Sequence, residues 1–160
     1  MAKKIEKTNA ARLLDRAGIP YKMIPYEFDE NDLAAQHVAD SLGQDIKMVF
    51  KTLVLQGDKT GHIVCVVPGD LEVDLKALAK ASGNKKVEMI AMKDLLSVTG
   101  YIRGGCSPIG MKKRFPTYFH STAINYDHIY VSAGVRGLQL ELSPADLIGF
   151  GGGIVSEVAI

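Results

Sequence analysis

The spacing of apolar residues along the chain predicts a series of helices. The first runs from Thr8 to Ala17, with the Thr8 hydroxyl placed to cap its first turn and Gly18 just past its end. The second covers residues 31–43 and ends at Gly43 in the same way. The others are expected over residues 72–83 and 92–100 and, starting from the N-cap pair Ser143 and Pro144, near the end of the sequence.

Runs of β-branched and aliphatic residues predict the strands. The clearest pair covers residues 48–56 and 61–68, which the turn-forming segment Gly-Asp-Lys-Thr-Gly joins as a hairpin. Residues 19–29 are expected to be extended, because the prolines within them exclude a helix. The remaining strands are expected over residues 87–91, 114–120, 128–134 and 137–143.

These helices and strands are mixed without regular alternation, which favours an α+β fold around a mixed, mostly antiparallel, barrel-like sheet with surrounding helices. A chain of 160 residues is long enough for one domain that buries about two thirds of its unfolded surface. Nothing in residues 1–160 indicates a repeat or a domain boundary. The glycine-rich segment 149–160 is expected to be a flexible connector, followed by a tail that either adds a strand or is disordered.

Charge and targeting signals narrow the setting. The chain has 19 Lys and Arg against 18 Asp and Glu, so a nucleic-acid coat over the whole surface is not expected, whereas local contact with a polyanion remains open. Two cysteines are too few for a disulfide framework. No apolar run is long enough to span a membrane, and the first residues lack the apolar core of a signal peptide. We therefore expect a cytoplasmic protein.

Lys51 stands inside the apolar strand predicted over residues 48–56. Met48, Val49 and Phe50 precede it, and Leu53 follows Thr52. A lysine ammonium is almost never fully buried unless a partner receives its charge. The pattern predicts an anionic partner for Lys51, either in the protein or in a bound ligand.

Two loops rich in glycine and serine, residues 103–110 and 131–137, are expected to leave main-chain amides open to a ligand, because glycine lacks the side chain that would block approach. Such amides can hold a phosphate or stabilise an oxyanion. Tight turns without a ligand are the alternative that composition leaves open. The spacing permits both loops and Lys51 to converge on one anionic ligand. The loop residues concerned are Gly104, Gly105, Ser107, Pro108, Ser132 and Gly134.

Lys112, Lys113 and Arg114 form a local basic cluster directly after the first of these loops. Such a run is usually a solvated face. Next to an anion-binding loop it can instead contact a nucleic-acid backbone, which is a role that does not depend on sequence. We therefore treat the cluster as a candidate nucleic-acid contact.

Other chemistry finds little support in the sequence. The 4 histidines, His37, His62, His120 and His128, lack metal-ligand spacing, and surface or capping roles are expected for them. Nucleotide-binding and serine-nucleophile motifs are missing, so neither a metal nor a cofactor is expected. A nucleophilic Cys106 would need a base or a cation that lowers its pKa, and an inert, partly buried thiol is the commoner case.

Four stretches in unbroken order carry a resemblance to a known family: "VFKTLVLQ", "VVPGDLEVDLKALAKASGNKKVEMI", "TGYIRGGCSPIGMKKRFPTYF" and "IYVSAGVRGLQLELSPADL". Together they resemble the YbaK family over roughly residues 8–148. Its members are free-standing aminoacyl-tRNA deacylases, related to the editing domain inserted in bacterial prolyl-tRNA synthetases. The resemblance implies an α+β fold and removal of a wrong amino acid from tRNA. The motifs are most similar to those of one branch of the family, for which the implied substrate is Cys-tRNA(Pro), with Cys-tRNA(Cys) as a further substrate.

The same resemblance assigns roles to residues. It implies that Lys51 is the indispensable side chain and that Gly104 and Gly105 complete a catalytic oxyanion site. It also places Tyr26, Thr52 and Ser132 around the substrate. One position departs from the family pattern, because Gln139 stands where cysteine-specific members carry an acid.

The resemblance further implies catalysis without a protein nucleophile, in which the thiol of the substrate attacks its own carbonyl and releases a cyclic thiolactone. The partners implied are the CCA end of an aminoacyl-tRNA and, as a protein, prolyl-tRNA synthetase. Two alternatives stay open. One is a deacylase for another small amino acid such as alanine, and the other is a module that binds a tRNA end or nucleotide without chemistry.

Overall fold

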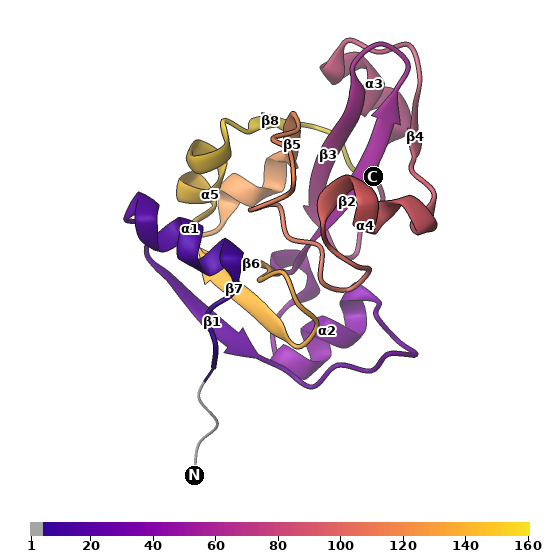
Figure 1. Ribbon diagram of the computed structural model, residues 1–160. Helices are drawn as coiled ribbons and strands as arrows, with labels where there is room; N and C mark the ends of the chain where they lie inside the picture. Colours follow the sequence, from indigo (N-terminus) through magenta and orange to yellow (C-terminus); the bar gives the residue numbers. More distant parts are fainter. Residues whose placement is uncertain (1–4) are drawn as a thin grey trace.

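The computed structural model describes residues 5–160 and contains two β-sheets (Figure 1). The smaller sheet is antiparallel and has the strand order β1-β7-β6, with β1 at Tyr21–Pro25, β7 at Leu138–Leu142 and β6 at Ile129–Ser132. The larger has the order β4-β2-β3-β5-β8. Its strands are β4 (Val87–Met89), β2 (Phe50–Gly57), β3 (Gly61–Pro68), β5 (Thr117–His120) and β8 (Ile154–Ser156).

This arrangement confirms the α+β class and the mixed, mostly antiparallel pairing. Only the contacts of β5 with β3 and β8 are parallel among the strand pairs of residues 5–160. The barrel-like closure expected from the sequence is wrong, because the strands form two separate sheets. They approach each other where Val49, just before β2, makes a parallel bridge to Tyr130 of β6.

The helices begin and end where local chemistry directs them. In α1 (Asn9–Ala17) the Thr8 hydroxyl accepts a hydrogen bond from the Ala11 amide at 3.3 Å, and Gly18 ends the helix with φ 70°, as predicted. Short 3-10 turns lie at Ile46–Met48, Met92–Asp94 and Ser121–Asn125. The other helices are α2 (Ala35–Leu42), α3 (Leu75–Ser82), α4 (Leu95–Thr99) and α5 (Pro144–Gly151).

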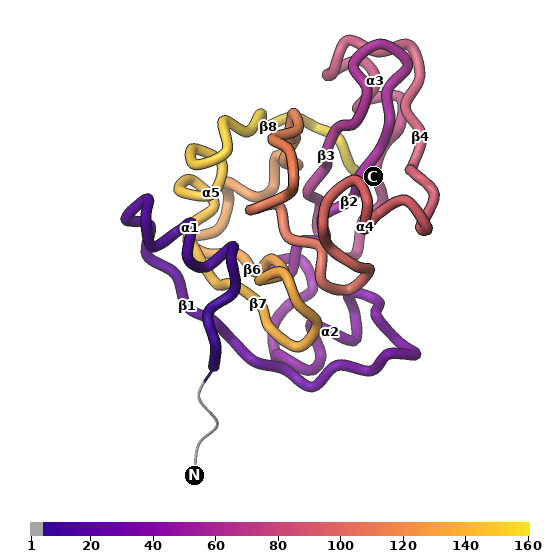
Figure 2. Tube along the Cα trace, in the orientation of Figure 1, coloured from indigo at the N-terminus to yellow at the C-terminus, as the bar shows by residue number. Residues whose placement is uncertain are grey.

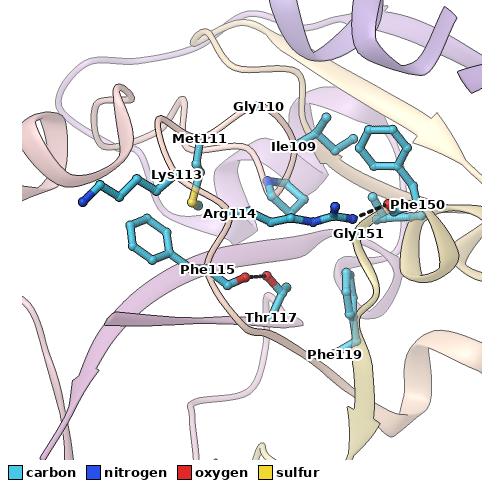
Figure 3. Close-up of a pocket in the computed structure, with 12 residues that line it drawn as sticks. Ile109, Gly110, Met111, Lys113, Arg114, Phe115, Thr117, Phe119, Phe150 and Gly151 are labelled. Atoms are coloured by element: carbon cyan, nitrogen blue, oxygen red, sulfur yellow. Dashed lines mark hydrogen bonds between the residues drawn. The ribbon is translucent and has the colours of Figure 1, made fainter. Parts of the chain in front are cut away.

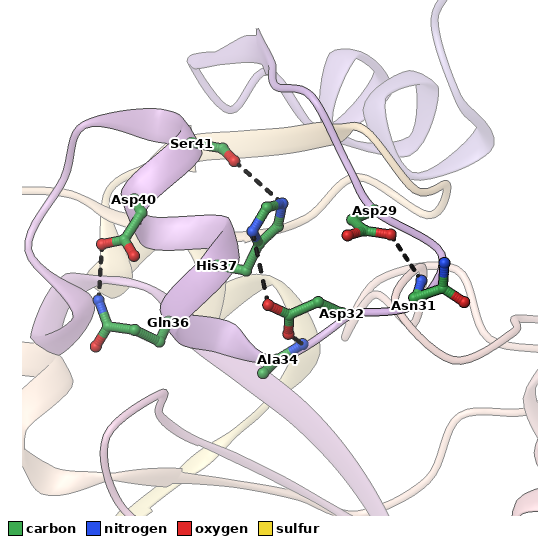
Figure 4. Close-up of polar contacts among 8 residues, drawn as sticks. All are labelled: Asp29, Asn31, Asp32, Ala34, Gln36, His37, Asp40 and Ser41. Atoms are coloured by element: carbon green, nitrogen blue, oxygen red, sulfur yellow. Dashed lines mark hydrogen bonds and ion pairs between the residues drawn. The ribbon is translucent and has the colours of Figure 1, made fainter.

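Helix α2 starts four residues later than the apolar pattern suggests, because the preceding aspartates form turns with the main chain (Figure 4). Asp29 Oδ1 accepts from the Asn31 amide at 2.9 Å, and Asp32 Oδ1 accepts from the Ala34 amide at 3.4 Å. Short acidic side chains compete in this way with helical hydrogen bonds. The turn brings residues 33–36 into the lining of a pocket that also contains Lys51.

The core has two layers on either side of β3. Val64 and Val66 face the space between the two sheets, where they pack with residues of α1, β6 and β7. Ile63, Cys65 and Val67 face the other way and pack against α3 and Tyr118. Because β3 is buried on both faces, its sequence reads as a continuous apolar run rather than as an alternating one.

The glycine-rich segment is not a flexible connector. Gly149 and Gly151 belong to α5, Gly152 ends that helix with φ 64°, and β8 follows as an added strand beside β5. The chain then crosses toward the β2–β3 hairpin (Figure 2), where Ala159 bridges Val73 in antiparallel fashion. Of the two alternatives for the tail, the added strand is therefore the one observed.

His120 was expected at the surface or at a cap, and this expectation is wrong. Its side chain is buried, and its Nδ1 accepts a hydrogen bond from the Val158 amide at 3.2 Å. An accepting nitrogen carries no proton, so His120 is held as the tautomer protonated at the other nitrogen. The histidine thereby fixes the segment after β8 to the end of β5.

Candidate functional site

A pocket of about 590 Å³ opens where the two sheets approach each other. Of the residues that the sequence marks as functional, it brings together Lys51 and Thr52 from β2, Gly104 from the loop after α4, and Ser132 from the end of β6. Gln139 of β7 lines the same space. Residues that are far apart in the sequence thus share one cavity.

Lys51 finds its anionic partner within the protein. Its side chain is 24% exposed, and its Nζ lies 3.3 Å from Oε1 of Glu72. The Glu72 side chain is 82% exposed, so Lys51 lies inside the pocket and Glu72 lies at its mouth. Because Glu72 is well hydrated, it holds Lys51 weakly and leaves the ammonium free to meet an anionic ligand.

The two glycine- and serine-rich loops meet, which was one of the possibilities left by their spacing. The Arg136 Nε donates to the main-chain oxygen of Arg103 at 2.9 Å and so ties the second loop to the first. A Cβ placed on Gly105 would lie 3.2 Å from the backbone of Val135, so a larger residue would force the two loops apart by a few tenths of an ångström. The loops and Lys51 thus converge on one pocket.

The amides of the two adjacent glycines differ in availability. Gly105 donates its N–H to the oxygen of Ile102 at 2.9 Å, which closes a turn and removes that amide from the pocket. The Gly104 amide makes none of the hydrogen bonds found among residues 5–160, and Gly104 lines the pocket. Gly104 is therefore the better candidate for an oxyanion donor.

Two buried polar atoms of the pocket lack a partner among residues 5–160: Oγ1 of Thr52 and Oε1 of Gln139. A buried acceptor or hydroxyl without a hydrogen bond costs free energy, of the order of 1–3 kcal/mol. Both residues line the pocket, so a ligand with matching polar groups can recover that cost. Ser132 is already engaged, because its Oγ accepts from the Gly134 amide at 3.1 Å.

Sequence reasoning missed two charged residues of the pocket, Arg103 and Glu72. Arg103 directly precedes the glycine pair, and this position is the signal that could have revealed it. Glu72, between β3 and α3, carried no comparable signal, because its role depends on its contact with Lys51 of β2. Most of the remaining wall is apolar and includes Leu33, Val38, Ile46, Met89, Ile90, Met92 and Leu95.

The start of α2, which forms part of this wall, is held by polar contacts (Figure 4). His37 Nδ1 lies 3.7 Å from Oδ2 of Asp32, and His37 Nε2 lies 3.4 Å from Ser41 Oγ. The three side chains resemble a serine-histidine-acid arrangement, but His37 and Asp32 are 32% and 53% exposed and lie outside the residues that line the pocket. We assign them to surface contacts that steady the first turns of α2, and a surface position is one of the two roles expected for His37.

Several of the expected site residues lie elsewhere. Tyr26 does not line the Lys51 pocket, and its main-chain N–H donates to Gly137 at 3.0 Å. Ser107 is fully buried, and its Oγ accepts from the Ile109 amide at 3.2 Å. Gly134 donates its amide hydrogen to Ser132 Oγ but does not itself line the pocket.

The basic cluster borders a second, separate cavity of about 310 Å³ (Figure 3). Pro108, Lys113 and Arg114 line it together with aromatic residues of β5 and α5. The guanidinium of Arg114 donates through Nη2 to the oxygen of Phe150 at 3.0 Å, so it is partly occupied by the fold. Lys112 and Lys113 are exposed. The cluster therefore lies outside the Lys51 pocket.

Cys106 lines the pocket, but its thiol is poorly suited to attack. Burial raises the pKa of Cys106 to about 12, so the thiol stays protonated near neutral pH. For the deacylation that the sequence resemblance implies, we expect Cys106→Ser to keep its single-turnover rate within about tenfold of the wild type, which corresponds to ~1.4 kcal/mol. A folded variant that loses several orders of magnitude would point to a covalent enzyme intermediate.

Comparison with known proteins identifies the family. The sequence model of the family described as the aminoacyl-tRNA editing domain matches residues 29–150 of this chain. The chain belongs to this family. It is 54% identical over 160 residues to EbsC of Enterococcus faecalis, named as a proposed Cys-tRNA(Pro)/Cys-tRNA(Cys) deacylase, and the match covers 99% of this chain and 98% of EbsC. The resemblance to the YbaK family seen in the sequence is thereby confirmed.

More distant relatives agree with this placement. A proline–tRNA ligase of Fervidobacterium nodosum is 31% identical over 85 residues, which are 53% of this chain and 15% of the ligase. A solved structure described as a proposed trans-editing enzyme for prolyl-tRNA synthetase superposes with a TM-score of 0.83 at 21% identity, covering 97% of this chain and 99% of the other. At that identity the likeness shows the fold of the editing domain.

The described residues were also compared with the requirements of a metal site and of a membrane-spanning helix. Among residues 5–160, no three His, Cys, Asp or Glu side chains gather closely enough to hold a metal ion. Within the same residues, no helix combines the length and the apolar character that a bilayer span requires.

Proposed function

We propose that this protein is a trans-editing deacylase that removes cysteine from mischarged Cys-tRNA(Pro), with Cys-tRNA(Cys) as a second substrate. The observation that carries the proposal is the pocket in which Lys51, the Gly104 amide and two unpartnered polar atoms meet. The 54% identity to EbsC over nearly the full length of both chains supports the choice of substrate. We also propose a cytoplasmic location, because charged tRNA and prolyl-tRNA synthetase act in that compartment.

The substrate is an ester between the amino acid and the terminal ribose, which is already activated for cleavage. The enzyme has to hold the CCA end and stabilise the negative charge that develops on the carbonyl oxygen. Lys51 supplies a compact positive charge for that oxygen, or for the neighbouring phosphate, and the Gly104 amide supplies a second donor. Gly105 acts indirectly in this scheme by fixing the turn through its bond to Ile102.

The attacking group belongs to the substrate. The cysteine thiol forms a bond to its own carbonyl carbon, the ester C–O bond breaks, and the thiol proton passes to the ribose oxygen that leaves. The products are a cyclic thiolactone and tRNA with a free terminal hydroxyl. The Cys106 thiol is protonated near neutral pH, and among residues 5–160 no histidine lines the pocket, so the hydroxyls and the thiol of the described wall have no imidazole base in the lining.

Contacts to the tRNA body are expected to be few. Lys112 and Lys113 are exposed beside the second cavity and can meet backbone phosphates, with Arg114 as a weaker contributor because of its bond to Phe150. For single-stranded nucleic acid, the logarithm of the binding constant falls by about 0.7 per decade of salt for each phosphate neutralised. We expect two to four such contacts. A plot of the logarithm of the binding constant against the logarithm of the salt concentration should then have a slope of roughly −1.4 to −2.8. A much steeper slope would show that the protein grips the tRNA body.

The test of the proposed function is turnover. Purified protein at catalytic concentration is mixed with Cys-tRNA(Pro), and the release of free tRNA is followed over many equivalents. Several turnovers per protein molecule are expected. Stoichiometric binding without release would instead assign the chain to the class of tRNA-end-binding modules, and preferential cleavage of Ala-tRNA(Pro) would change the substrate. Addition of prolyl-tRNA synthetase to the same assay tests whether that enzyme is a physical partner.

A further inference from the structure

Glu72 is the only carboxylate among the described residues that line the Lys51 pocket. The other charged side chains of the lining are Lys51 and Arg103, and Gln139 contributes a neutral amide. Glu72 Oε1 lies 3.3 Å from the Lys51 ammonium at the mouth of the pocket. The site thus presents one negative charge directly beside its central positive charge.

An aminoacyl ester carries the complementary pair. Its α-ammonium is positive, and its carbonyl oxygen becomes negative as the carbon turns tetrahedral. The two groups sit on adjacent carbon atoms, so an ester that places its carbonyl oxygen at Lys51 brings its ammonium within reach of the neighbouring carboxylate. We propose that Glu72 binds the α-ammonium group of the aminoacyl-tRNA. This inference rests on the proposed deacylase function.

The high exposure of the Glu72 side chain is compatible with this role. A carboxylate that is 82% exposed gains little from Lys51 alone, so it can exchange that contact for a ligand at low cost. Once the tRNA end covers the mouth, water is excluded and a charge-assisted hydrogen bond to the ammonium becomes stronger. Glu72 then favours aminoacyl esters that carry the positive α-ammonium group over acyl esters that lack it.

The main chain of Glu72 is held by a segment far away in the sequence. The Glu72 amide donates to the oxygen of Ile160 at 2.9 Å, and the Ile160 amide donates to the oxygen of Glu72 at 2.9 Å. Asp74 extends the ladder with a bond to the oxygen of Val158 at 2.8 Å. Val158 is buried and is itself tied to His120. Residues 158–160 therefore position Glu72 at the pocket, and Figure 2 shows this segment reaching the β2–β3 hairpin.

The experiment compares two substrates that differ only in the ammonium group: Cys-tRNA(Pro) and 3-mercaptopropionyl-tRNA(Pro), which has hydrogen in its place and keeps the thiol. We measure kcat/KM for both with the wild type and with Glu72→Gln. The ratio between the substrates should fall by roughly tenfold to a hundredfold in Glu72→Gln, because one charged hydrogen bond is lost. Intrinsic reactivity of the two esters cancels in this comparison of ratios.

A matched control comes from β4, where Glu88 forms a similar exposed pair with Lys86 at 3.1 Å outside the pocket lining. Glu88→Gln should keep the wild-type ratio. If Glu72→Gln also keeps that ratio, or if it accelerates both substrates equally, Glu72 does not bind the ammonium and the proposal is wrong. A wild type that cleaves neither substrate would overturn the deacylase function, and the assignment with it.

A second variant tests the positioning of Glu72. Ile160→Pro removes one main-chain donor to Glu72 while changing a side chain that is 73% exposed. It should lower the substrate ratio in the same direction as Glu72→Gln but by less, with an unchanged melting temperature within a few degrees. A ratio equal to that of the wild type would show that residues 158–160 do not position the carboxylate.

Discussion

Lys51→Ala is expected to lower the single-turnover rate of Cys-tRNA(Pro) deacylation by roughly a hundredfold to a thousandfold or more, the size seen when one oxyanion donor is removed. Lys51 supplies the charge nearest to the reacting carbonyl in the proposed mechanism, and the described lining of the pocket offers only Arg103 as a second cation. A pre-steady-state measurement with saturating protein separates this loss from a change in tRNA binding.

The fold should tolerate this replacement. The partner of Lys51, Glu72, is 82% exposed and remains hydrated when the ammonium is gone, so no buried charge is left unpaired. Lys51→Met, which keeps the apolar stem, should be equally inactive. Lys51→Arg should also be poor, because a planar fork replaces a compact ammonium.

Lys22, an exposed lysine of β1 outside the pocket lining, provides the matched control, and Lys22→Ala should behave as the wild type. Circular dichroism and thermal melting establish that each variant is folded. A folded Lys51→Ala protein with most of its activity would remove Lys51 from the catalytic site.

The second large effect concerns the substrate. S-methylation of the cysteine on Cys-tRNA(Pro) is expected to stop deacylation, because the methylated sulfur can no longer form the thiolactone. Effective molarities of well-oriented internal nucleophiles reach roughly 10⁵ M or more, so loss of this step should cost several orders of magnitude. Ser-tRNA(Pro) should likewise be cleaved much more slowly than Cys-tRNA(Pro), since a hydroxyl of nearly the same shape is a far weaker nucleophile near neutral pH.

Binding must be measured alongside the rate. The methylated substrate should compete with Cys-tRNA(Pro) at a similar concentration, which shows that it enters the pocket. Analysis of the product provides an independent check, because the internal attack yields the thiolactone before any free cysteine. Cleavage of the methylated substrate at a comparable rate would identify water as the nucleophile.

Much of the local structure was predictable because it depends on groups close together in the chain. The cap at Thr8, the glycine ends at Gly18 and Gly43, and the β2–β3 hairpin follow from hydrogen bonds and φ angles within a few residues. The prominence of Lys51 was visible for the same reason, since a cation within an apolar strand signals an unmet charge. Motif order was sufficient to indicate the family that the comparisons establish.

The composition of the pocket was decided by tertiary structure. Glu72 reaches Lys51 because residues 158–160, more than eighty positions away in the sequence, form a main-chain ladder with Glu72 and Asp74. The Gly105 amide was expected to face the ligand, but in the folded loop it closes a turn on Ile102. Lys113 and Arg114 follow the same loop and nevertheless border a different cavity.

These differences have one physical cause. The alternation of apolar residues and the chemistry of caps constrain each element by itself, whereas pairing between distant segments depends on how the elements pack. The sequence alone therefore determined the class of fold, most helix ends and the presence of a functional cation. Only the folded chain decided that the strands form two sheets instead of a barrel, which amide is free, and which carboxylate stands beside Lys51.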